Sequence, residues 1–157
     1  MKIIMGLKRI KHLDRKIEKN MVRIDQWCSY VERKGDPSVP YDSNDIRRMH
    51  QQIADWATER ARVVHALHVT NTTVTVKYNG KDFTLDELMT MKNHVIPRKI
   101  QALKHMRRAQ KRYEERGKVV VQFDHVERDK NLDALAAELD AIDTILDIQS
   151  IEVDLVE

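Results

Sequence analysis

Residues 3–31 read IIMGLKRIKHLDRKIEKNMVRIDQWCSYV, and this stretch decides the fold. Apolar side chains recur along it at alternating spacings of three and four residues, which is typical of a helix with one buried stripe. Asp14 interrupts that stripe, whose apolar members are Ile3, Leu7, Ile10, Ile17, Met21, Ile24, Cys28 and Val31. The sequence therefore predicts a long first helix with one charge on its packing side.

A second apolar stripe follows the break at Gly35-Asp36-Pro37, where proline cannot continue a helix. This stripe runs from Ile46 to Leu67, and Arg60 interrupts it. In an antiparallel hairpin, counting away from the loop places Asp14 within one helical turn of Arg60. An unpaired buried charge costs several kcal/mol, so we expect these two side chains to pair with each other or to face a ligand.

The rest of the chain predicts two further helices and short strands. We expect helices at about residues 3–33, 44–69, 84–116 and 131–150, and strands at about 72–78, 119–123 and 151–156. The third helix begins with a capping box at Thr84 and Glu87, and Pro97 predicts a kink inside it. We therefore predict a mainly α fold, in which residues 1–157 form a single domain. That domain would be an antiparallel four-helix bundle with a small sheet of two or three strands.

Charge is distributed unevenly along the second half of the chain. Residues 92–118 carry ten basic and two acidic residues, whereas residues 119–157 carry two basic and eleven acidic residues. The opposite charges predict that the acidic last helix lies along the basic third helix. The alternative is that the basic third helix binds nucleic acid through the phosphate backbone.

The sequence contains no recognisable catalytic motif. Only four glycines are present, and none forms a phosphate-binding loop. Cys28 is the single cysteine, so we expect neither a disulfide within one chain nor a cysteine metal site. His65 and His68 have the spacing of metal ligands but no partner motif. We therefore expect no enzymatic activity, no cofactor and no metal site. No apolar run approaches the roughly 18 residues of a membrane span, which predicts a cytoplasmic protein with no membrane partner.

The charges on the apolar stripes are the strongest candidates for a binding site. Arg60 suits bidentate binding of a phosphate or a carboxylate, Asp14 would orient it, and Lys92 has no partner in the predicted hairpin. The predicted ligand-binding residues are Asp14, Arg60, Asn71, Lys92, Arg98 and Lys99. The alternative is that Asp14 and Arg60 form an ion pair that only fixes the helix register.

Part of the chain resembles a known group of proteins. The resemblance lies in the segments Thr70-Asn71-Thr72-Thr73, Gly80 to Leu88 with its GKxxTLxEL pattern, and Leu135 to Asp143 with its LxxELxxID pattern. Over roughly residues 60–150 the chain resembles the small helical proteins of bacteria and phages labelled septicolysin-like. The resemblance implies a helical fold and a phage or mobile-element origin, and it assigns no catalytic residue. In general traits only, the chain is similar to phage proteins that sequester nucleotide immune signals.

These observations lead to one functional hypothesis and two alternatives. We expect a non-enzymatic, anti-defence binding protein. It would capture a phosphate-bearing molecule, such as a cyclic nucleotide or an ADP-ribose signal, in a polar pocket between the helices of a homo-oligomer. The first helix would be about 45 Å long at 1.5 Å per residue, which predicts packing on a second copy. The first alternative is a structural or assembly protein, such as a virion or scaffold component. The second is nucleic-acid binding through the third helix.

Overall fold

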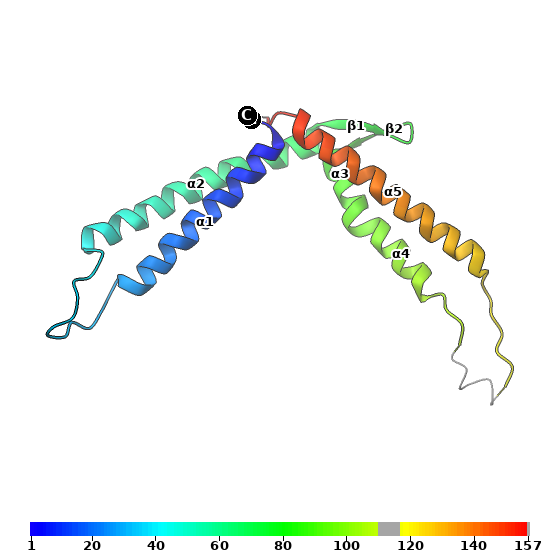
Figure 1. Cartoon of the computed structure of the whole chain (residues 1–157). Helices are drawn as coiled ribbons and strands as arrows, with labels where there is room; N and C mark the ends of the chain where they lie inside the picture. Colours follow the sequence, from blue (N-terminus) through cyan, green and yellow to red (C-terminus); the bar gives the residue numbers. More distant parts are fainter. Residues whose placement is uncertain (110–116, 157) are drawn as a thin grey trace. The chain divides into compact units, whose positions relative to one another are not determined.

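The computed structural model describes residues 1–109 and 117–156. Its elements are α1 (Ile3–Trp27), α2 (Ser43–Thr73), β1 (Thr75–Tyr78), β2 (Lys81–Thr84), α3 (Leu85–Thr90), the π-helix η1 (Met91–Val95), α4 (Ile96–His105) and α5 (His125–Glu152) (Figure 1). The prediction of a mainly helical chain with a small sheet is confirmed. We expected a single domain, and the chain forms two compact units. Unit 1 comprises Met1–Thr70 and Ser150–Glu157, and unit 2 comprises Asn71–Gln149.

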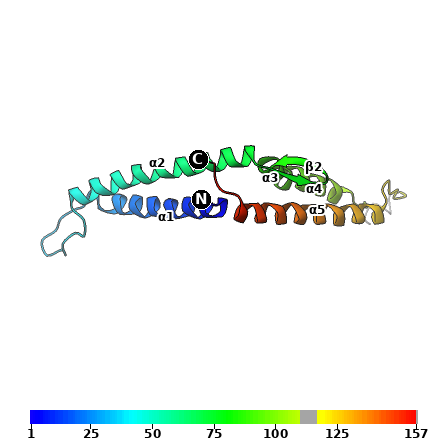
Figure 2. The same ribbon diagram turned by 90° about the horizontal axis from the view of Figure 1, so that it is seen from above.

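Unit 1 is built on an antiparallel pair of helices. In both ribbon views α1 and α2 run side by side (Figure 2). The buried apolar side chains of these helices are Ile3 and Leu13 from α1 and Met49, Val63 and Leu67 from α2. α1 ends at Trp27, six residues before the predicted end at Arg33, and α2 continues to Thr73.

The packing side of α1 differs from the prediction at every second position. Eight of its buried and half-buried residues follow a seven-residue repeat, namely Ile3, Gly6, Ile10, Leu13, Ile17, Asn20, Ile24 and Trp27. The predicted stripe had Leu7, Asp14, Met21 and Cys28 in place of every second member, and these four residues are exposed. The observed choice keeps the carboxylate of Asp14 in contact with water, which avoids the penalty of burying a charge. On α2 the predicted stripe from Ile46 to Leu67 is the packing side.

The last residues of the chain return to the start of α1. The amide of Ile3 donates to the carbonyl of Val153 at 3.1 Å, and the amide of Leu155 donates to the carbonyl of Met1 at 2.7 Å. The predicted strand at 151–156 is therefore shorter than expected, because α5 continues to Glu152 and only one bridge forms, between Lys2 and Asp154.

Gly6 lies where the last segment of the chain packs on α1. A Cβ atom at Gly6 would lie 2.8 Å from Cδ1 of Leu155 and 3.5 Å from Cγ1 of Val63. Leu155 itself is 8% exposed. The absence of a side chain at position 6 therefore lets the last segment pack on α1 and α2.

Unit 2 begins with a β-hairpin. β1 pairs antiparallel with β2 from Thr75–Thr84 to Tyr78–Lys81, and the two turn residues Asn79 and Gly80 have φ angles of 50° and 75°. These positive angles explain the choice of Asn and Gly, which tolerate the left-handed region. The predicted strand at 72–78 is thus confirmed in its second half, and β2 is a strand that the sequence analysis missed. The predicted strand at 119–123 is not a strand in the structure.

The predicted third helix is divided into three parts. Its capping box is present, since Thr84 Oγ1 accepts from the amide of Glu87 at 3.1 Å and Glu87 Oε2 accepts from the amide of Thr84 at 2.7 Å. η1 then separates α3 from α4, which begins immediately before Pro97. Proline has no amide hydrogen, so the wider π-turn changes the hydrogen-bond register where a donor is missing. α4 ends at His105, whereas the prediction ran to Arg116; positions 110–116 of that prediction lie outside the described residues.

α5 covers the other helices of unit 2. Tyr78, Leu88, Ile96 and Ile142 form the buried cluster, with further half-buried side chains packed around it from β1, β2, η1, α4 and α5. The acidic last helix therefore does lie along the basic helix, as the charges predicted. α5 begins at His125 rather than at Asn131, because Asp124 accepts hydrogen bonds from the amides of Val126 at 2.8 Å and Glu127 at 3.3 Å.

Candidate functional site

Asp14 and Arg60 form the ion pair that the sequence predicted across the hairpin. Arg60 Nε lies 2.5 Å from Asp14 Oδ1, and Arg60 Nη2 lies 3.5 Å from Asp14 Oδ2. Both side chains are accessible, with 41% and 48% of their surface exposed. Exposed pairs of this kind contribute about 0–1 kcal/mol to stability. The pair therefore holds the guanidinium in place without being buried.

Further polar contacts join α1 to α2 on either side of this pair. Arg9 bonds Glu59 at 2.7 Å, and Lys16 lies 5.1 Å from the ring centre of Trp56. The hydrogen bond from Arg9 lowers the pKa of the Glu59 carboxyl, and the same bond raises the pKa of Arg9. These contacts require one alignment of the two helices.

Asn20 is the polar residue at the helix interface that the sequence analysis missed. It is 3% exposed, and its Nδ2 donates to Oε1 of Gln52 at 2.9 Å. Leu13, Asn20 and Trp27 are seven residues apart in the sequence, so Asn20 could have been placed on the packing side. The adjacent residues Met21 and Cys28 have the same spacing and are apolar, which favoured the wrong set. A single polar residue at such a position specifies helix register.

Lys92 has a partner in unit 2. Its ammonium group forms a salt bridge with Asp143 of α5. Arg60 belongs to unit 1 and Lys92 to unit 2, and each cation is neutralised by a carboxylate of its own unit. The partner lies 51 residues further along the chain, outside the first hairpin, in which the sequence predicts no partner for Lys92.

The three remaining predicted site residues belong to two helices. Asn71 is half-buried in the last turn of α2, and Arg98 and Lys99 are exposed on α4. Of these three, Lys99 lines a groove.

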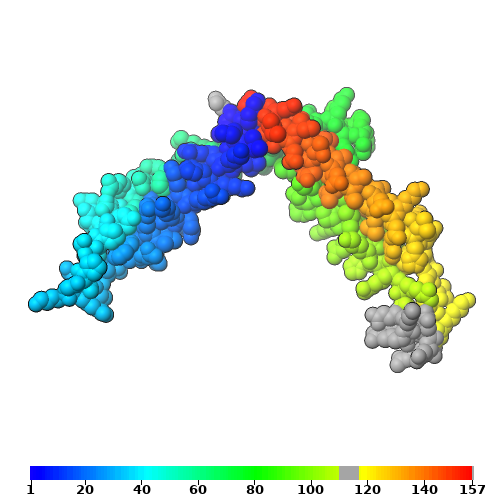
Figure 3. Space-filling model, viewed as in Figure 1, coloured from blue at the N-terminus to red at the C-terminus, as the bar shows by residue number. Residues whose placement is uncertain are grey.

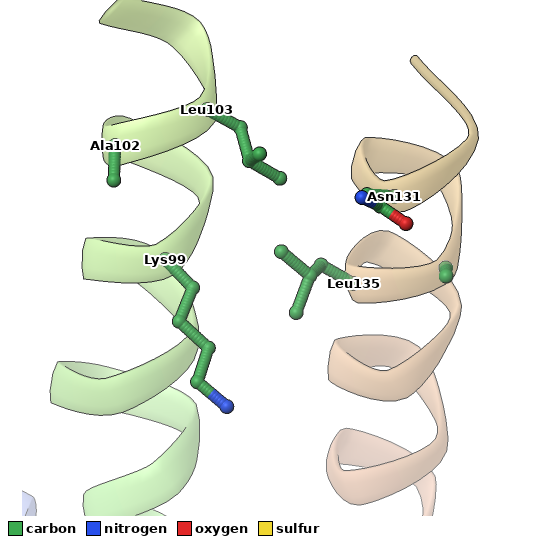
Figure 4. Close-up of a pocket in the computed structure, with 6 residues that line it drawn as sticks. Lys99, Ala102, Leu103, Asn131 and Leu135 are labelled. Atoms are coloured by element: carbon green, nitrogen blue, oxygen red, sulfur yellow. The ribbon is translucent and has the colours of Figure 1, made fainter. Parts of the chain in front are cut away.

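This groove lies between α4 and α5 and has a volume of about 430 Å³. Leu103 and Leu135 point toward one another across it, and Lys99 extends from the same side as Leu103 (Figure 4). Its lining residues are Lys99, Ala102, Leu103, Asn131, Ala134 and Leu135. A mostly apolar lining with one cation and one amide suits a ligand that combines an apolar body with an anionic group.

α5 carries apolar side chains on two sides. One side packs into unit 2 through Leu135, Leu139 and Ile142. The opposite side is exposed and has the same three- and four-residue spacing; we call it the outer face of α5, and it consists of Ala137, Ala141, Thr144 and Ile148. In the space-filling view no other part of unit 2 lies in front of the orange surface of α5 (Figure 3).

Exposed apolar side chains are common throughout the described part of the chain. Among residues 1–109 and 117–156, sixteen large apolar side chains are exposed and eleven apolar side chains are buried. On α1 the exposed group includes Met5, Leu7, Met21 and Val22. Each unit therefore leaves much of its apolar surface without a partner.

Several classes of site are not found in the described residues. No group of three or more His, Cys, Asp or Glu side chains there is placed to hold a metal ion. None of the helices seen in that part of the chain combines the length and hydrophobicity needed to cross a bilayer. Comparison of the chain with family models, curated proteins and solved structures gave no significant match.

Proposed function

We propose that this chain is a structural or assembly protein whose copies associate through exposed helix faces. The observation that carries the proposal is the outer face of α5, because a helix with apolar side chains on two opposite sides is normally covered on both of them. Unit 2 covers only the inner side of α5. A further protein surface is therefore needed to cover the outer face.

The balance of exposed and buried side chains supports the same proposal. Exposed apolar side chains on the outer sides of helices are candidates for contact with another protein surface. Ile148 on α5 is 46% exposed, and Met5 and Met21 on α1 are 52% and 53% exposed. Association of copies would remove these side chains from water. This burial would stabilise the assembly by about 25 cal/mol for each Å² of apolar surface buried.

Light scattering coupled to size-exclusion chromatography tests the proposal. We expect a mass that is a multiple of 18.5 kDa and that falls on dilution. Ala141→Glu, on the outer face of α5, should lower that mass. Ala136→Glu is the matched control, because Ala136 is exposed on α5 but belongs neither to the core side nor to the outer face. A monomer at about 100 µM, the highest concentration tested, would show that the proposal is wrong.

Capture of a nucleotide-like ligand stays a prediction and becomes the second candidate. Arg60 and Lys92 support it less than expected, because both donate to carboxylates. The α4–α5 groove supports it, because Lys99 lies beside an apolar lining. The anti-defence role depends on this candidate and stays a prediction with it, and the phage origin, which the resemblance implies, also stays a prediction.

Calorimetric titration with cyclic nucleotides and ADP-ribose tests ligand capture. We expect Lys99→Ala and Leu103→Trp to weaken binding, and Lys104→Ala, an exposed cation on the same helix, to leave it unchanged. Absence of binding by the unaltered protein would remove this candidate. Nucleic-acid binding through residues 98–116 also stays a prediction, since positions 110–116 lie outside the described residues.

A further inference from the structure

We infer that the outer face of α5 docks on the outer side of α1 in a second copy of this chain. This inference rests on the proposed function and names the two surfaces that meet. It commits to a second copy as the occupant because the two surfaces are complementary in charge and in the spacing of their charges.

The outer face of α5 is flanked by acidic side chains on both sides. Asp133 and Asp140 directly precede Ala134 and Ala141 and are seven residues apart, so they line one flank at intervals of about 10.5 Å. Both are exposed. Glu138 lies on the other flank, where it is half-buried and hydrogen-bonded to Tyr78, and the exposed Lys130 continues the line of the outer face toward the start of the helix. A partner for this face therefore has to bring cations.

These flanking carboxylates exclude pairing of α5 with α5. In an antiparallel pair Asp133 and Asp140 would face the same residues of the partner, and in a parallel pair they would face Glu138. Like charges placed opposite each other along a helix contact act against that pairing. The outer face of α5 thus rejects its own copy and selects a basic helix.

α1 offers such a helix on the side that faces away from α2. The outer side of α1 consists of Met5, Lys8, His12, Arg15, Lys19, Val22 and Gln26, all exposed and none acidic. Lys8 and Arg15 are seven residues apart, the same interval as Asp133 and Asp140. One alignment of the two helices therefore brings both cations beside both carboxylates.

The shapes of the two surfaces also match. The alanines of α5 leave shallow space along the helix, so a second helix can approach closely. Met5 and Val22, which are 52% and 45% exposed, have the size to fill that space. The hydrocarbon stems of Lys8 and Arg15 can lie along the same apolar strip while their charged ends reach the carboxylates.

A contact between two different surfaces has a consequence for stoichiometry. Each copy offers one α1 surface and one α5 surface, so the contact is head-to-tail. Such contacts form a closed ring when the rotation between copies allows closure, and an open filament when it does not. We therefore expect assemblies that can exceed two copies.

Charge reversal tests the inference by light scattering. Variant A carries Lys8→Glu and Arg15→Glu, and variant B carries Asp133→Lys and Asp140→Lys. We expect each variant alone to dissociate with a dissociation constant raised at least about tenfold. An equal mixture of A and B should assemble again, because the acidic α1 of A meets the basic α5 of B, and the two unaltered surfaces also meet.

A matched control variant carries Arg62→Glu and Lys104→Glu, which change the charge as in variant A at exposed positions outside both surfaces. Circular dichroism of every variant checks that the helices are retained. If A and B assemble as the unaltered protein does, the inference is wrong and the proposed function stands. If the unaltered protein is monomeric, both are wrong. Retention of nucleic acid by a monomer through Lys8 and Arg15 would also overturn the inference.

Discussion

The two units hold their helices together in different ways. Between α1 and α2 the packing positions include Gly6, Asn20 and Arg60, and the polar ones are satisfied by partners on the facing helix. Both units bury apolar side chains, and those of unit 2 form a cluster centred on Ile96 and Ile142, which are 1% and 0% exposed. Apolar packing supplies free energy in many alignments, whereas buried polar pairs are satisfied in one. The difference suggests that unit 1 depends on register and unit 2 on close packing.

The largest effect is expected from Ile142→Ala. Removal of a fully buried isoleucine side chain from a core costs about 2–5 kcal/mol, since it loses burial and leaves a cavity. Denaturant unfolding measures the loss, and hydrogen exchange locates it in unit 2. Val126→Ala, at a site 76% exposed, is the control and should change little. If amide hydrogen exchange became faster in unit 1 by the same factor as in unit 2, the two units would not unfold separately.

Gly6→Ala tests the close approach in unit 1. The new Cβ would lie 2.8 Å from Leu155 Cδ1, so we expect overpacking to cost about 1–3 kcal/mol and to speed exchange of the Leu155 amide. In a chain that already carries Leu155→Ala, Gly6→Ala should instead raise the free energy of unfolding by up to about 1 kcal/mol, because alanine forms helices better than glycine. Destabilisation in both backgrounds would show that the contact with Leu155 is not the cause.

Asn20→Leu separates register from stability. Replacing a buried amide by an apolar side chain of similar size should keep or raise the free energy of unfolding by about 1 kcal/mol or less, while removing the bond to Gln52. We expect extra amide resonances in unit 1, which report a second alignment of α1 against α2. A single set of resonances would mean that Asn20 does not set the register.

A smaller effect on stability is expected at the ion pairs formed by the predicted site residues Arg60 and Lys92. Double-mutant cycles on Asp14 with Arg60, and on Lys92 with Asp143, should each give a coupling of about 0.2–1 kcal/mol that weakens with salt. Thermal unfolding of the single and double alanine variants measures both couplings. A coupling above about 3 kcal/mol for Asp14–Arg60 would indicate burial of the pair in an assembly.

The smallest effect is expected on acidification. Hydrogen bonds from Arg9 and Lys2 lower the pKa values of Glu59 and Asp154 in the folded chain. Such carboxylates contribute stability above their unfolded pKa values near 4, and this contribution is lost as the pH falls through the lower folded values. Thermal unfolding of the whole chain between pH 7 and pH 3 should show this loss of stability. Glu59→Gln should flatten the dependence, and an unchanged slope would contradict the role of Glu59.

Local patterns predicted much of the helical part of the fold. The α2 stripe, the hairpin, the Asp14–Arg60 pair and the capping box at Thr84 all depend on residues whose spacing is visible in the sequence. The packing of α5 on α4 followed from opposite charges together with apolar stripes.

Other features depend on contacts between distant segments. Two adjacent columns on α1 are both suitable for packing, and only the facing helix decides between Leu13 and Asp14. The partner of Lys92 and the place of Leu155 beside Gly6 likewise require three-dimensional neighbours. Asp124 is a residue type that commonly caps a helix, yet the sequence predicts the start of the last helix only at about residue 131.

The return of the last segment to Met1 has a consequence for the order of folding. Unit 1 is discontinuous, because residues 71–149 intervene between its two parts. The amide of Val156 donates to Thr70 Oγ1 at 2.9 Å, so the two sides of that long insertion are tied together. Closing a flexible loop of this length would cost about 4 kcal/mol in chain entropy. When unit 2 is folded, fewer flexible residues separate Thr70 from the last segment, so the entropy cost is smaller. The last segment should therefore dock on α1 after unit 2 has folded. Unfolding of unit 2 should release the last segment before the rest of unit 1 unfolds.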